Sequence, residues 1–198
     1  MSGRRGWALW IGGWALVAAL VAWALVPERR GGGPGSASPL ERLLGPVASL
    51  AASAEWVRFD VAQRRGDTAR AYALAETALR IDPGDPEGWI FLAHDLVHER
   101  GSLLREPDPV ARAAWIRAGL ATLERGERVS RDPGALAFER GVVLAFLASL
   151  ADEDRAWPSS AEEAWTLAAQ AFETAAASGN PRGRLAAELA RAHAKSAR

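Results

Sequence analysis

The hydrophobic pattern separates one continuous apolar run from a long segment in which apolar residues recur at helical spacing. The run covers residues 7–26, reads WALWIGGWALVAALVAWALV and contains no charged side chain. A helix rises about 1.5 Å per residue, so the run would extend about 30 Å, which is the hydrocarbon thickness of a bilayer. The pattern therefore predicts a single transmembrane helix that contacts the lipid bilayer through residues 7–26.

A cleaved signal peptide is the alternative for this run, because residues 22–24 loosely resemble a small-x-small cleavage site. Against it, the run is longer than a usual signal core, a tryptophan occupies the middle of the site, and Arg29 and Arg30 follow as at a membrane boundary. We therefore expect residues 1–26 to form a short tail and a retained anchor in a bacterial inner membrane. Arginines flank both ends, but Glu28 and the amino terminus favour export of the following domain.

The remainder of the chain predicts a linker followed by an all-α domain. Residues 27–38, PERRGGGPGSAS, are rich in glycine, serine and proline, which is typical of a flexible linker. Over residues 39–198, apolar positions are spaced three and four apart, and no strand-like alternation is present. Helix-breaking residues divide this domain into helices expected at 46–65, 67–81, 86–100, 108–130, 135–151, 159–178 and 183–196.

Small residues placed seven apart indicate that these helices pack in pairs at a regular interval. The pairs are Ala71 and Ala78, Gly119 and Gly126, and Ala164 and Ala171. They recur after 48 and then 45 residues. A nearly fixed period in this range is typical of an α-solenoid, in which helical hairpins stack on one another.

Residues 54–96 resemble the tetratricopeptide repeat, a unit of helix A, a tight turn, helix B and a closing proline. Trp56 stands near the start of the first helix A, and Gly66-Asp67 fills the turn. The segment LRIDP over residues 79–83 matches the end of a repeat. Residues 86–93, PEGWIFLA, match the tryptophan, leucine and small-residue positions of the next helix A.

The later units depart from this pattern while keeping the hairpin arrangement. The second has about fourteen extra residues, including 101–107, and the third about eleven, including 152–158. The third helix A retains only Gly141 at the small position. The resemblance implies about three tetratricopeptide-like hairpins, closed by residues 183–197 as a C-terminal capping helix.

In this family, the A helices line a groove that receives a peptide or a partner helix. The resemblance thus implies a membrane-anchored, non-catalytic scaffold or adaptor that binds a protein or peptide partner, itself membrane-associated. The groove residues it implies are Arg58, Asp60, Arg64, Ile90, His94, Asp95, Val97, His98 and Phe138, with Val142 as a further candidate. The alternative for each is a solvated position on a helix surface.

Both insertions fall between a helix A and a helix B, so we expect them at the same edge of the array. Leu103, Leu104 and Trp157 lie in them as candidate contacts. They suggest a second hypothesis, a structural subunit of a larger envelope complex that is bound through this edge. Trp157 has the alternative of folding back onto the adjacent helix ends.

Composition removes several classes of chemistry. The 198 residues include no cysteine, which excludes disulfides, thiol catalysis and cysteine-ligated metals. The chain has a formal net charge of zero, but its first 30 residues contain four arginines and one glutamate, so the domain itself is mildly acidic. We therefore expect no nucleic-acid partner.

His94 and His98 are the best candidates for chemistry, because histidines four apart share a helix face and can chelate a metal. The pattern resembles the zinc-protease helix His-Glu-x-x-His, but Asp95 stands where the catalytic glutamate should be. The third histidine, His193, is remote in sequence. A metal-dependent hydrolase is therefore the disfavoured alternative, and we expect no enzyme activity and no cofactor.

Overall fold

The computed structural model describes residues 39–152, 154–158 and 160–197. Every regular element within these residues is a helix, as the sequence predicts. No helix among them is both long and apolar enough to cross a membrane. The predicted anchor at 7–26 and the linker at 27–38 lie outside the described residues.

The helices follow the predicted order, most of their bounds agree with the predicted ones within three residues, and two differences are larger. They are α2 (Pro39–Arg64), α3 (Thr68–Ile81), α4 (Pro86–His94), the π-helix η1 (Asp95–Arg100), α5 (Pro109–Glu127), α6 (Pro133–Ala148), α7 (Ala161–Ala177) and α8 (Gly183–Ser196). Helix α2 begins at Pro39 rather than at residue 46, and the helix expected over 86–100 changes to π geometry at Asp95.

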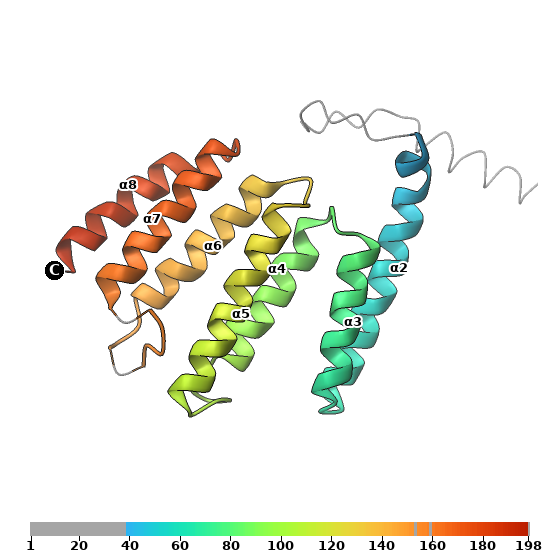
Figure 1. The fold of residues 1–198 in the computed structure, drawn as a ribbon, viewed down its shortest axis with the longest axis horizontal. Helices are drawn as coiled ribbons and strands as arrows, with labels where there is room; N and C mark the ends of the chain where they lie inside the picture. The colour runs from blue at the N-terminus through green and yellow to red at the C-terminus, as the bar shows by residue number, and fades with distance from the viewer. Residues whose placement is uncertain (1–38, 153, 159, 198) are drawn as a thin grey trace, which may run out of the picture.

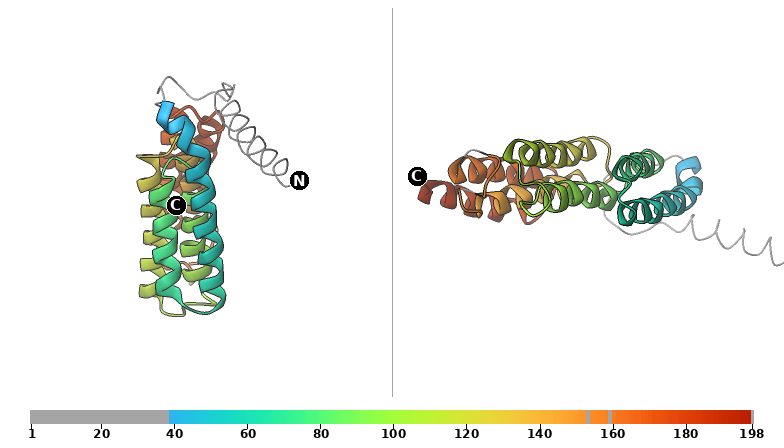
Figure 2. Two further views of the ribbon diagram at one scale, coloured as in Figure 1. Left: turned by 90° about the vertical axis from the view of Figure 1, so that its right-hand side faces the viewer. Right: turned by 90° about the horizontal axis from the view of Figure 1, so that it is seen from below.

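The helices form two layers, visible when the molecule is viewed along their axes (Figure 2). Helices α2, α4, α6 and α8 lie in one layer, and α3, α5 and α7 lie in the other. Chain neighbours are antiparallel, so the molecule is an elongated row of hairpins (Figure 1). The two long loops, before α5 and before α7, lie along the same edge of the row, at the lower ends of the helices in Figure 1.

Aspartates begin most of these helices and explain why the boundaries were readable from sequence. Asp85, Asp108 and Asp132 each accept a hydrogen bond from a backbone N–H of the first turn, and a proline follows each of them. An aspartate at the N-cap satisfies an otherwise unpaired donor, and proline at the first helical position sacrifices no hydrogen bond. Asp67 caps α3 in the same way.

The small residues seven apart are all buried, and they mark where backbones approach closely. A Cβ added to Gly119 would lie 2.5 Å from Val97 Cγ2, and one added to Gly126 would lie 2.7 Å from Trp89 Cγ. Helix α5 therefore packs against α4 and η1 at a separation that only glycine permits at these two positions.

The π-helix has a cause in the sequence pattern. Buried residues come in adjacent pairs that are four residues apart, at 88–89, 92–93 and 96–97. On an α-helix of 3.6 residues per turn, a four-residue repeat drifts by about 40° per turn away from the core. The wider π turn absorbs this drift and returns Leu96 and Val97 to the core.

Hydrogen bonds connect corresponding turns of successive hairpins. The backbone N–H of Arg131 donates to Gly84 O at 3.0 Å, and its guanidinium pairs with Asp82. One hairpin later, Asn180 Nδ2 donates to Gly134 O at 3.2 Å. These partners are 46 to 49 residues apart, which is close to the interval between the small-residue pairs. Each hairpin is therefore joined to the next at an equivalent place.

Candidate binding face on the layer of α2, α4 and α6

Aromatic and histidine side chains gather on the exposed side of the α2–α4–α6 layer. We call this surface the His94 face, and it consists of Trp56, Phe91, His94, His98, Glu139 and Phe146. Phe91 and Phe146 are 50% and 44% exposed, which is unusual for phenylalanine in a folded domain. The surface is therefore a candidate for contact with another molecule.

The α2 side of this face is an edge-to-face aromatic cluster. The ring centroids of Trp56 and Phe91 are 5.2 Å apart at an angle of 79°, and Phe91 and Phe59 are 5.6 Å apart. Phe59 is buried and anchors the cluster to the core. Phe91 is thus held by α2 on one side while the rest of its ring remains open to solvent.

The α6 side of the face is organised around the two histidines. His94 Nε2 lies 2.7 Å from Glu139 Oε1, which joins α4 to α6. The His94 and His98 rings are 5.2 Å apart, and the His98 ring is 4.9 Å from Phe146. The histidines therefore bridge two helices and bring a polar pair into an otherwise aromatic surface.

The pKa values of the two histidines are shifted in opposite directions. The hydrogen bond to Glu139 raises the pKa of His94, and it outweighs partial burial, which acts in the other direction. Partial burial, together with the neighbouring His94, lowers the pKa of His98. As the pH falls, His94 takes up a proton before His98, so a charged pair with Glu139 stands beside a neutral ring.

Asp95 connects three helices instead of lining the open face. Its carboxylate accepts hydrogen bonds from Gln63 Nε2 at 2.9 Å and from the Tyr72 hydroxyl at 2.7 Å. Burial, followed by the contact with Asp95, raises the pKa of Tyr72 well above its usual range. Arg100 also donates to Gln63. Asp95 is therefore best explained as a cross-link between η1, α2 and α3.

The structure brings together some of the predicted groove residues and separates others. Val97 is only 3% exposed and packs in the core, because the π turn rotates it inward, so it does not line the surface. Arg58 shares a pocket with Arg70 of α3, because a residue two positions after Trp56 points the opposite way on a helix. Asp60 and Arg64 are exposed and pair with each other.

The remaining predicted groove residues lie at the boundary between surface and core. Ile90 and Phe138 are half-buried and pack against the core cluster. The ring centroids of Phe138 and Phe172 are 5.2 Å apart. Val142 is exposed and lies one helical turn before Phe146. It extends the apolar part of the His94 face along α6.

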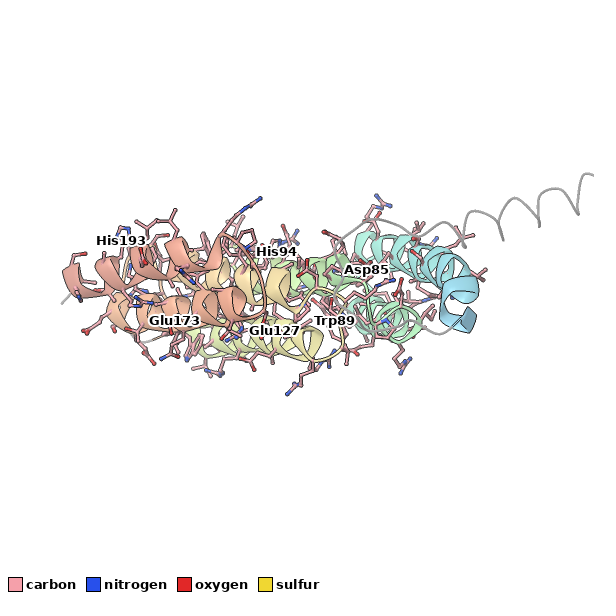
Figure 3. All side chains as sticks on the ribbon, turned by 90° about the horizontal axis from the view of Figure 1, so that it is seen from above. Asp85, Trp89, His94, Glu127, Glu173 and His193 are labelled. Carbon is pink, nitrogen blue, oxygen red and sulfur yellow. The ribbon has the colours of Figure 1, made fainter. Side chains whose placement is uncertain are left out.

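Whether the histidine pair could hold a metal depends on the described residues around it. Among the described residues, no group of three or more histidine, cysteine, aspartate or glutamate side chains is arranged to hold an ion. His193 stacks on Trp165 at 4.5 Å, and it lies toward the far end of the row from His94 (Figure 3). The third histidine therefore does not complete a site with the other two.

The insertion loops differ from one another. Leu104 is 95% exposed in the first loop, and Leu103 beside it is also open to solvent. Trp157 in the second loop is half-buried and packs against the core cluster. Arg155 helps to hold that loop, because its Nε donates to Leu147 O at the end of α6 at 3.0 Å. The second loop is therefore closed down onto the helices, and the first presents leucines outward.

Phe91, Glu139 and Phe146 were missed by the sequence interpretation. The sequence does contain a signal for Phe91, because this residue precedes His94 by three positions and therefore lies on the same face of the helix. Glu139 follows His94 by 45 residues, which equals one of the intervals between small-residue pairs. Applying the repeat interval to His94 would have identified its partner.

Comparison with known proteins identifies no relative: no family model, no curated protein and no solved structure matches the chain. The evidence for function is therefore the surface itself.

Proposed function

We propose that this protein is a membrane-anchored, tetratricopeptide-like adaptor whose His94 face binds a peptide or helix of a protein partner. The observation that carries the proposal is the group of exposed apolar side chains on one layer. Phe91, Val142 and Phe146 are open to solvent on neighbouring helices, around the paired His94 and Glu139. Exposed aromatic anchors beside a few polar groups suit a peptide that carries apolar side chains.

The solenoid part of the proposal is supported by contacts that repeat along the row. The turn-to-turn hydrogen bonds, the His94–Glu139 pair and the Arg125–Glu76 pair all join residues 45 to 49 apart. Stacked hairpins make such contacts because each unit meets only its neighbours. Helix α8 would then close the row, with Ala187, Ala190 and Ala194 buried against its neighbour and with Leu185 and Leu189 exposed on its other side.

The anchor part of the proposal rests on the sequence of residues 7–26. An adaptor held at a bilayer meets a membrane-associated partner in a small volume, and this raises the effective concentration of that partner. No catalytic step is assigned, since the His94 face holds neither a nucleophile paired with a base nor a third metal ligand within the described residues.

The test is affinity capture of the full-length protein from detergent-solubilised membranes, with partners identified by mass. We expect the variant Val142→Ser with Phe146→Ser to lose the main partner at least tenfold. Val110→Ser with Val129→Ser is the control, because these two apolar side chains are even more exposed than Val142 and Phe146 but lie outside the His94 face. Retention of the partner by the first variant would contradict the proposal.

The second candidate, a subunit bound through the insertion loops, is favoured by the exposure of Leu103 and Leu104. The same capture separates the two candidates. Loss of the partner in Leu103→Ser with Leu104→Ser, but not in the variant of Val142 and Phe146, would assign binding to the loop.

A further inference from the structure

Helix α2 has a second apolar side that faces away from the rest of the molecule. Ala52, Phe59 and Ala62 are buried and point toward the neighbouring helices. On the opposite side, the exposed residues form a stripe: Val47, Leu50, Ala54, Val57 and Val61. Leu50 is 73% exposed and Val57 is 65% exposed. A surface helix needs only one apolar side to pack against its own domain, so this stripe is unexplained by the monomer.

The spacing of the stripe is that of a coiled coil. The five residues follow one another at intervals of three, four, three and four, which are the a and d positions of a heptad repeat. In sequence, Leu40 and Leu43 continue the same register toward the start of α2. Two of the three a positions are valine and one of the two d positions is leucine. β-branched residues at a with leucine at d favour two-stranded assemblies.

The length of α2 leaves room for such a partner. Helix α2 has 26 residues, whereas α3 has 14 and packs along its C-terminal part. The beginning of α2 projects beyond α3 and α4 (Figure 1). The stripe is thus open along most of the helix.

Charges beside the stripe determine how two copies would align. Arg58 and Arg65 occupy the e positions and Asp60 occupies a g position. Arg65 is still on the helical path, because its N–H donates to Val61 O at 3.2 Å. In a parallel pair, position g of one helix meets position e of the next heptad in the other, so Asp60 meets Arg65 of the second copy.

An antiparallel pair lacks this complementarity. In an antiparallel pair, e positions of one helix would face e positions of the other, and g positions would face g positions. Arg58, Arg65 and Asp60 would then meet no oppositely charged residue at these positions of the second copy. On the α3 side, a shallow pocket of about 230 Å³ lies beside Val57 and Val61, and its lining holds three arginines, including Arg70, against one carboxylate, Asp67. A parallel second copy would bring its Asp60 to this arginine-rich side of the helix. An antiparallel copy would bring its own arginines there, and like charges would repel.

We propose that a second copy of this chain covers the stripe, and that two α2 helices form a parallel, two-stranded coiled coil over residues 47–61. Arg64 stands at the next d position and ends the seam. In the monomer Arg64 pairs with Asp60, but both side chains are more than half exposed and can exchange partners. The proposal does not depend on what the His94 face binds.

The chain has no cysteine, so a single introduced cysteine reports on one position. The test uses full-length protein in membranes, with Val47→Cys, Ala54→Cys and Val61→Cys as separate variants under mild oxidation. A parallel coiled coil predicts disulfide-linked dimers at all three positions. Ala121→Cys is the control, because Ala121 is exposed on α5, in the other layer.

Each other outcome counts against the proposal. Residues 47 and 61 are about 21 Å apart along a helix, so an antiparallel pair joins like positions at no more than one of the three. A dimer at only one position would overturn the parallel arrangement. If none of the three variants formed more disulfide-linked dimer than Ala121→Cys, the coiled-coil proposal would be overturned. The stripe would then be left to contact lipid or another protein.

A charge exchange tests the alignment without altering the seam. We expect Asp60→Arg to reduce the disulfide-linked fraction of the Ala54→Cys variant about fivefold, because two like-charged contacts replace two opposite ones. Adding Arg65→Asp should restore the dimer. Failure of this restoration, with helical content unchanged by circular dichroism, would contradict the assigned register.

Discussion

His94 is the residue that joins α4 to α6 at the open side of their layer. It binds Glu139 of α6, and it stacks edge-on against His98. The sequence predicted that the two histidines share a helix face, because that follows from their spacing alone. It did not predict Glu139, because the contact between α4 and α6 depends on how two hairpins stack.

At this scale we predict that Glu139→Gln lowers the pKa of His94. The hydrogen bond to Glu139 is the largest contribution to its raised value, and a neutral amide replaces a charged acceptor. The measurement is an NMR titration of the histidine rings in a fragment of residues 39–198. Glu188→Gln on α8 is the control and should leave the titration of His94 unchanged.

The sign of the pH dependence of folding follows from the same shifts. A raised pKa in the folded state means that the His94–Glu139 pair stabilises the fold fully below the unfolded pKa of about 6.5, and that this stabilisation is lost as the pH rises through the pKa of His94. His98 acts oppositely, because its lowered pKa costs stability as the pH falls below about 6.5. A titration in which Glu139→Gln leaves His94 unchanged would show that the pair is not formed in solution.

At the scale of the helices, boundaries were predictable where a cap or a breaker marked them. The aspartate-proline starts of α4, α5 and α6 are of this kind. Helix α2 begins earlier than expected because Pro39 is suited to a first helical position and because the Gly45-Pro46 pair does not end the helix. The π turn was missed because its signal is a four-residue spacing of buried pairs, and burial is known only after folding.

The close approach of α5 to η1 gives a prediction for Gly119. A methyl group at this position would meet Val97 Cγ2 at 2.5 Å and the backbone oxygen of Ala93 at 2.9 Å. We expect Gly119→Ala to lower the free energy of unfolding by about 1–3 kcal/mol, even though alanine favours the helix. Urea unfolding followed by circular dichroism measures the change.

The exposed neighbour Ala118 supplies the matched control. Ala118→Leu adds more atoms to the same helix on its open side, and we expect a change within about 0.5 kcal/mol. If both variants lowered the free energy of unfolding equally, Gly119 would not be at a close contact.

At the scale of the whole molecule, the interval between small residues predicted paired helices, and every regular element in the described part of the chain is a helix, with those small residues buried. The sequence could not predict which side of each helix stays open, because that depends on the neighbours of the helix. Arg58 illustrates this, since it points toward α3 and away from α4.

The two proposed surfaces use different sides of the row. The seam uses the a and d positions of α2, whereas the His94 face takes only Trp56 from that helix. A parallel dimer would therefore leave two His94 faces open. It would also place the N-terminal ends of both α2 helices on the same side, as the proposed anchoring in one bilayer requires.

The central claim is that the His94 face contacts a protein partner, and photo-crosslinking in cells tests it most directly. A photoreactive phenylalanine analogue replaces Phe91, Phe146 or, as the control, Ala121 in the full-length chain within cells that naturally produce it. We predict that Phe91 and Phe146 yield a crosslink to the same partner and that Ala121 does not. No crosslink at either phenylalanine, or an equal crosslink at Ala121, would contradict the account.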